Sequence, residues 1–136
     1  MKPATRLWTA QSVLAALFLF AGVFKLITPT DVLTVQSHMP GEFIKFIGVC
    51  ETLGAFGLIL PGLTKIRPEL TPLAAAGLVI IMIGAVVTSI LQGAGIGSAF
   101  PGVVGLLALY VARGRWPKAG EAAPRVLEPT VLRRAA

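Results

Sequence analysis

Four long apolar stretches, separated by short segments rich in polar residues, proline and glycine, dominate the chain. They cover about residues 7–27, 43–60, 72–92 and 99–112. An α-helix rises 1.5 Å per residue, so about 20 residues cross the ~30 Å hydrocarbon core of a bilayer. The pattern therefore predicts an all-α protein, a bundle of four transmembrane helices in which the fourth helix is short.

Proline and threonine mark the ends of the predicted helices. Pro29 disfavours helical geometry at the residue before it and ends the first helix, and Pro61 ends the second. Thr71 suits the N-cap of the third helix, and Pro72 suits its first helical position. The connection between the first two helices, residues 28–41, is predicted to be a loop.

Small and polar residues recur at steps of three and four in the first three apolar stretches, so each set shares one helix face. We expect these faces to point towards other helices, because small residues let helix backbones approach closely in membranes. In the third helix, Gly77 and Gly84 predict a close-packing seam. The positions in the first two helices are Gln11, Ala15, Phe18, Gly22 and Lys25, then Ile44, Gly48, Glu51, Gly54, Ala55 and Leu58.

The composition agrees with a membrane protein. The 136 residues are 55% hydrophobic and 13% charged, and the mean hydropathy is +0.83, whereas soluble domains carry about 25% charged residues. The formal charge of +6 does not indicate nucleic-acid binding, because most basic residues flank the apolar spans and suit anionic lipid headgroups. The first span could also be read as a signal peptide, but its length and the spans that follow favour a helix.

The basic residues also predict an orientation. Lys2, Arg6, Lys65 and Arg67 fall on one side of a four-span model, together with the tail, residues 117–136, which contains several prolines. Loops on the other side contain no lysine or arginine, so the positive-inside rule places both termini in the cytoplasm. Residues 1–116 would then form the four-helix transmembrane domain, and the basic tail would follow it.

Glu51 lies near the middle of the second span, where a carboxylate is unfavourable by about 2.5 kcal/mol or more. Lys25 is the basic residue at matching depth on the first helix. Side chains in a helix lean towards its N-terminus, so in antiparallel neighbouring helices the Lys25 and Glu51 side chains lean towards each other. This geometry predicts an ion pair, either direct or through a water molecule. Two alternatives stay open: Lys25 extends to the outer interface, or Glu51 is protonated and hydrogen-bonded within the bundle.

Other polar residues carry weaker signals. Gln11 shares the Lys25 face but lies near the inner surface, which predicts a different contact, and Thr88 and Ser89 are expected to bond to backbone carbonyl groups. Cys50 is the single cysteine, which excludes an intrachain disulfide and a cysteine-cluster metal site. His38 is the single histidine, so no metal site is predicted.

Several short segments occur in a fixed order between residues 7 and 112: Phe20–Lys25, Met39-Pro40, Phe46–Gly48 with Glu51, Gly54-Ala55, Leu58–Pro61, Leu70–Gly77 and Met82–Ala85. Together they resemble the DoxX-like family of small four-helix bacterial membrane proteins. The resemblance implies a multi-pass protein of the bacterial inner membrane, and Lys25 and Glu51 fall on the family's recurring polar positions. Relatives often carry a histidine near the inner end of the third helix, where this chain has Thr88-Ser89.

The family takes its name from a subunit associated with thiosulfate:quinone oxidoreduction. The resemblance therefore implies an accessory or quinone-associated membrane subunit of a redox system, acting with an oxidoreductase partner. The sequence has no haem ligand pair, cysteine cluster or flavin motif, so we expect no intrinsic cofactor, with quinone as the candidate ligand. The alternatives are a scaffold or homo-oligomer built on the glycine faces, a proton or small-molecule carrier using Glu51, and an enzyme with Glu51 as general acid or base.

Overall fold

The computed structural model describes residues 2–117, and all regular secondary structure in that range is helical. Four of the helical segments are long and apolar enough to cross a membrane, which confirms the all-α class and the four predicted spans. Apart from Pro117, the predicted basic tail lies outside the described residues. The elements are α1 (Pro3–Ile27), α2 (Thr30–Ser37), α3 (Gly41–Thr64), α4 (Leu70–Leu91), the 3-10 helix η1 (Gly95–Ser98) and α5 (Ala99–Arg115).

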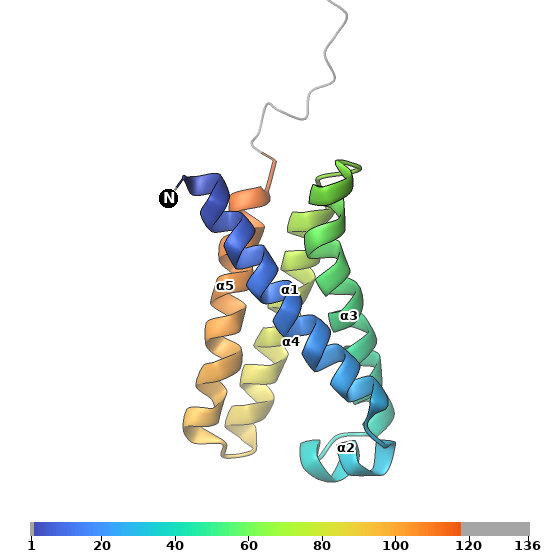
Figure 1. The fold of residues 1–136 in the computed structure, drawn as a ribbon. Coiled ribbons are helices and arrows are strands. Elements are labelled where there is room, and N and C mark those ends of the chain that lie inside the picture. The colour runs from blue at the N-terminus through green and yellow to red at the C-terminus, as the bar shows by residue number, and fades with distance from the viewer. Residues whose placement is uncertain (1, 118–136) are drawn as a thin grey trace, which may run out of the picture.

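The four long helices form two packed pairs, α1 with α3 and α4 with α5, and α3 packs against α4 to join them. Figure 1 shows α1 crossing the bundle diagonally, from the C-terminal end of α5 towards the start of α3. The start of α1 and the end of α5 lie at one end of the bundle, and the short helix α2 lies at the other. We call the first the basic end and the second the α2 end.

Glycines bring the backbones of α1 and α3 into direct contact. A Cβ atom added at Gly22 would lie 2.7 Å from the carbonyl oxygen of Gly48, and one added at Gly48 would lie 3.0 Å from the carbonyl oxygen of Gly22. Further along the same two helices, Leu14 and Leu58 are fully buried in the hydrophobic core. The small-residue packing predicted for these two helices is confirmed.

The predicted end of the second helix was wrong, because α3 continues through Pro61 to Thr64. Proline lacks the N–H that would bond one turn back, which usually interrupts a helix. The carbonyl group that Pro61 leaves without its helical donor is that of Gly57, one turn earlier. Gln11 of α1 bonds to the next carbonyl group: its Nε2 donates to the carbonyl oxygen of Leu58 over 2.7 Å and ties α1 to this turn of α3.

The connection predicted as a loop contains the helix α2. Pro29 precedes it with φ −58°, a value compatible with helix, and Asp31 places a negative charge in its first turn. Leu33 is 5% exposed and anchors the helix to the bundle. The sequence showed no long apolar run here, so a helix of eight residues was missed.

The packing predicted for the third helix was also wrong. α4 begins at Leu70, so Thr71 is buried inside the helix and makes no side-chain cap. Gly77 and Gly84 have no atom within 4 Å of an added Cβ, and the buried face instead contains Leu78 and Met82. Because α4 is apolar on every side, its sequence has no polar face from which the buried face can be identified.

Replacing Gly22 by alanine should destabilise the bundle by about 1–3 kcal/mol, the usual effect of overpacking. The matched change Gly77→Ala adds a methyl group in open space, so it should leave stability unchanged or raise it by up to about 1 kcal/mol through helix propensity. Thermal unfolding of both variants in detergent, followed by circular dichroism, measures the difference. Equal effects at the two positions would contradict the seam.

Candidate functional site

Lys25 of α1 and Glu51 of α3 form a direct ion pair in the half of the bundle nearer α2. The Lys25 Nζ lies 2.8 Å from the Glu51 Oε2, and the two side chains are 27% and 3% exposed. Gly48 lies one turn before Glu51, and the Lys25 Cβ would be 3.0 Å from a Cβ placed there. The glycine seam therefore lets the lysine chain pass close over α3 and reach the carboxylate.

The pair lies between two cavities with largely apolar walls. The α1–α5 cavity has a volume of about 570 Å³, and the α3–α4 cavity has a volume of about 530 Å³. Ile44 and Met82, together with the ion pair itself, line both of them. The charged groups are thus the main polar feature at the place where the two hollows meet.

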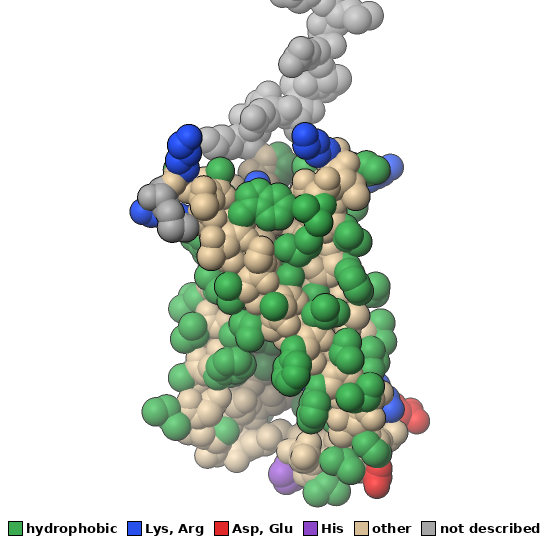
Figure 2. Space-filling model, viewed as in Figure 1, with side chains coloured by type: hydrophobic (Ala, Val, Ile, Leu, Met, Phe, Trp, Pro, Cys, Tyr) green, Lys and Arg blue, Asp and Glu red, His purple; other side chains and the backbone are tan. Residues whose placement is uncertain are grey.

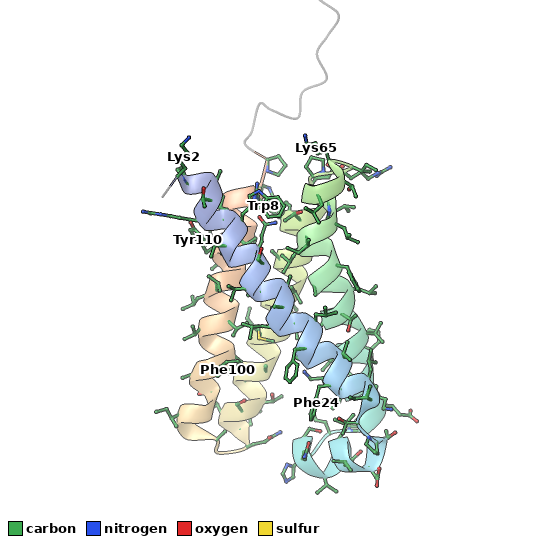
Figure 3. The ribbon with its side chains drawn as sticks, viewed as in Figure 1. Lys2, Trp8, Phe24, Lys65, Phe100 and Tyr110 are labelled. Atoms are coloured by element: carbon green, nitrogen blue, oxygen red, sulfur yellow. The ribbon has the colours of Figure 1, made fainter. Side chains whose placement is uncertain are left out.

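Aromatic side chains surround the α1–α5 cavity. Phe18, Phe20 and Phe24 of α1 face it from one helix, and Phe100 of α5 faces it from another. The rings of Phe20 and Phe24 stack with centroids 6.3 Å apart and planes 21° apart. Figure 3 shows Phe24 and Phe100 on the two helices that separate here, and Figure 2 shows the surface hollowed in the same region.

The helix α2 borders the α1–α5 cavity at its far end. Its residues Gln36 and Ser37 contribute polar atoms to the lining. Gln92, at the end of α4, donates from its Nε2 to the carbonyl oxygen of Ser37, 2.7 Å away. This hydrogen bond connects α2 to the α4–α5 pair, so α2 spans the end of the hollow.

The ion pair offers both kinds of hydrogen-bonding group to a ligand in these cavities. A lysine ammonium has three N–H donors, and Glu51 accepts from one of them. A carboxylate accepts hydrogen bonds, and after protonation it also donates one. Such a pair is able to bind a carbonyl or hydroxyl oxygen and to give or take a proton there, in surroundings where electrostatic interactions are stronger than in water.

A second polar cluster lies at the basic end, where the Trp8 ring packs against it. The Arg115 Nε donates to the Gln11 Oε1 over 2.6 Å, and the guanidinium carbon lies 5.3 Å from the centroid of the Trp8 ring. Since Gln11 also bonds to Leu58, the cluster links α1, α3 and α5. Gln11 therefore makes a contact separate from the Lys25–Glu51 pair, as predicted. The sequence analysis did not identify Arg115 as its partner, because a basic residue just after the last span is typical of a residue that contacts lipid headgroups.

Thr88 and Ser89 occupy the α2 end of α4. The Thr88 Oγ1 donates to the carbonyl oxygens of Gly84 and Ala85, at 2.9 and 3.1 Å, as predicted, and Thr88 also lines the α3–α4 cavity. The sequence analysis placed these two residues near the inner end of the helix, and that location was wrong. They lie at the α2 end, which is the outer end in the predicted topology. Within residues 2–117, no group of three His, Cys, Asp or Glu side chains is placed to hold a metal ion.

Comparison with known proteins identifies the family. The model of the DoxX-like family matches residues 9–111, which include all four long helices in whole or in large part. This chain belongs to the DoxX-like family. The matched region of this DoxX-like protein contains Gln11, Lys25, Glu51 and Thr88, whereas Arg115 lies beyond it. No curated protein and no solved structure matches the chain.

A double-mutant cycle should show that Lys25 and Glu51 are coupled. Lys25→Met leaves a carboxylate that is 3% exposed without its partner, so we expect a loss of about 3–5 kcal/mol of unfolding free energy. Glu51→Gln should have a smaller effect, because Lys25 is partly exposed and able to turn outward. The double variant should be more stable than the sum of the single changes implies, by about 1 kcal/mol or more. Additive losses in detergent unfolding would show that the pair contributes no coupling.

Proposed function

We propose that this DoxX-like protein binds a quinone at the Lys25–Glu51 pair and acts as an accessory membrane subunit of a redox system. The observation that supports this proposal best is the position of the pair, at the meeting point of two apolar cavities inside a bundle of membrane-spanning helices. A ligand that suits this site has a small polar head and a large apolar body.

A quinone combines those properties. Its planar ring carries two carbonyl oxygens, and its tail is a hydrocarbon. Lys25 is placed to donate to one carbonyl oxygen, and Glu51 is placed to accept the O–H of the reduced form. Phe18, Phe24 and Phe100 supply an aromatic wall for the ring, and each cavity volume falls within the range of about 300–1,000 Å³ typical of ligand sites.

The proposed role is accessory because this chain has few groups that hold a redox centre. It contains one cysteine and one histidine, whereas iron–sulfur clusters usually need four cysteine ligands. In the proposal, electrons reach the quinone from a partner oxidoreductase, and this subunit holds the quinone and exchanges its protons.

We also propose that the protein lies in the bacterial inner membrane with both termini in the cytoplasm. The basic end of the described chain carries six basic residues and one acidic residue, Glu69, as expected of a cytoplasmic surface. Figure 2 shows this concentration of lysine and arginine at the end opposite α2. At the α2 end, the acidic residues Asp31 and Glu42 accompany Lys45.

Reporter fusions test the orientation. Green fluorescent protein fused after Ala136 should fluoresce, and alkaline phosphatase at the same position should be inactive, because the former matures in the cytoplasm and the latter outside it. Phosphatase fused after Gly95, in the connection between α4 and α5, should be active. The reverse pattern would place the termini outside the cytoplasm.

Quinone binding should depend on the ion pair. We expect decylubiquinone to bind the purified protein and to slow alkylation of Cys50, the single cysteine, which lines the α3–α4 cavity. Lys25→Met and Glu51→Gln should each weaken binding by tenfold or more, since a hydrogen bond to a charged group contributes about 1.5–3 kcal/mol. Equilibrium dialysis of each variant measures the affinity.

Lys45→Met is the matched control for these variants. Lys45 lies at the same end of the bundle, donates to the carbonyl oxygen of Leu26 over 3.3 Å and lines neither cavity. Its replacement should leave quinone affinity within about twofold of the wild type, as for surface changes away from a site. If the wild type binds no quinone, or if Lys45→Met and Glu51→Gln weaken binding equally, the proposal is wrong.

A further inference from the structure

A third hollow lies far from the ion pair, between α4 and α5 near the basic end. We call it the α4–α5 groove. Its volume is about 300 Å³, its walls include Ala76 and Val79 of α4 and Ala112 of α5, and Arg113 and Trp116 lie at its end. It shares no lining residue with the α1–α5 cavity, and Ile80 of α4 is the one residue that lines both the groove and the α3–α4 cavity.

The shape of the groove follows from small side chains on both helices. α4 and α5 pack against each other, and Ala76 and Ala112 leave space between them that larger residues would fill. Leu109 and Trp116, at the two ends of the groove's α5 wall, are seven residues apart, or about 10 Å along a helix axis. The groove therefore has the length and the apolar character to hold the upper part of a lipid acyl chain.

The charge at the end of the groove favours an anion. Arg113 is exposed and forms no ion pair with any residue in the described range. Arg115, two residues later, instead turns to Gln11 and Trp8. Glu69 is the single acidic residue among the described residues of this end, so almost nothing there would attract the positive group of a zwitterionic headgroup.

Trp116 provides the boundary between the apolar and charged parts. It is 57% exposed and directly follows α5. Indole rings prefer the layer between lipid headgroups and acyl chains, where the ring is in contact with hydrocarbon and the N–H remains near water. Arg113 and Trp116 both line the groove, so the charged group and the indole ring lie at the same end of it.

We propose that the α4–α5 groove is a binding site for an anionic phospholipid, with one acyl chain between α4 and α5 and the phosphate on Arg113. The site is distinct from the proposed quinone site, because neither Lys25 nor Glu51 lines it and its charged residue, Arg113, lies at the opposite end of the bundle. Its occupant is a single lipid held by a specific arginine, in contrast to lipids attracted by the basic end as a whole.

Native mass spectrometry of the full-length protein in detergent tests the proposal. Phosphatidylglycerol and phosphatidylcholine with identical acyl chains serve as probes. The wild type should retain phosphatidylglycerol preferentially, and Arg113→Gln should reduce that retention by about fivefold, the effect of one basic residue at an anionic lipid surface. Lys65→Gln is the matched control, because it removes one charge from the same end outside the groove, and it should reduce retention by less than twofold.

A second variant tests the apolar part without changing any charge. Ala76→Leu fills the groove, so it should lower phosphatidylglycerol retention while Arg113 remains in place. Equal retention of the two lipids by the wild type would overturn the proposal. So would equal losses in Arg113→Gln and Lys65→Gln, which would indicate a general attraction to the basic end, or unchanged retention in Ala76→Leu.

Discussion

The close approach of α1 and α3 at Gly22 and Gly48 is the constraint on which the centre of this molecule depends. With the two backbones in contact, Lys25 passes over Gly48 and reaches Glu51 at 2.8 Å. A larger residue at either glycine would separate the helices and leave a buried carboxylate without a partner. An unpaired charge in apolar surroundings is strongly unfavourable, so the packing of the seam and the chemistry of the pair are inseparable.

The diagonal course of α1 explains why one end of the bundle is filled and the other is hollow. At the basic end α1 meets α5, where Leu7 packs on Gly114 and Trp8 covers Gly62 and stacks on Arg115. Towards α2 it diverges from α5 and follows α3, as Figure 1 shows. The space left by this divergence is the α1–α5 cavity, which the Lys25–Glu51 pair borders.

The two polar clusters illustrate two uses of polar residues inside a membrane bundle. Gln11 and Arg115 bond to groups on neighbouring helices and are covered by Trp8, which suits a contact that holds three helices together. Lys25 and Glu51 bond to each other and border space that a ligand can enter. Membership of the DoxX-like family accounts for the fold, whereas the proposed function rests on this difference between the clusters.

The sequence alone determined the four spans and their helical state, because bilayer thickness sets the length of an apolar run and the bilayer core leaves no water to satisfy other backbone structures. It also identified the inward faces of α1 and α3, where polar residues and glycines contrast with apolar neighbours. α4 offered no such contrast, so the prediction that Gly77 and Gly84 face inward was wrong. Likewise, nothing in the sequence near Pro61 revealed that α3 continues through the proline to Thr64.

The tertiary structure alone decided which polar groups meet and where space remains. Gln11 and Arg115 are 104 residues apart in the chain, and no local pattern connects them. Lys25 and Glu51 were predicted as neighbours from their depth and side-chain direction, but the sequence left open a lysine that extends to the outer interface. Only the packed helices show that Lys25 instead contacts Glu51 directly. The cavities on both sides depend on crossing angles among several helices at once. Those angles arise from the fit of side chains across each interface, which residue spacing along a single helix does not contain.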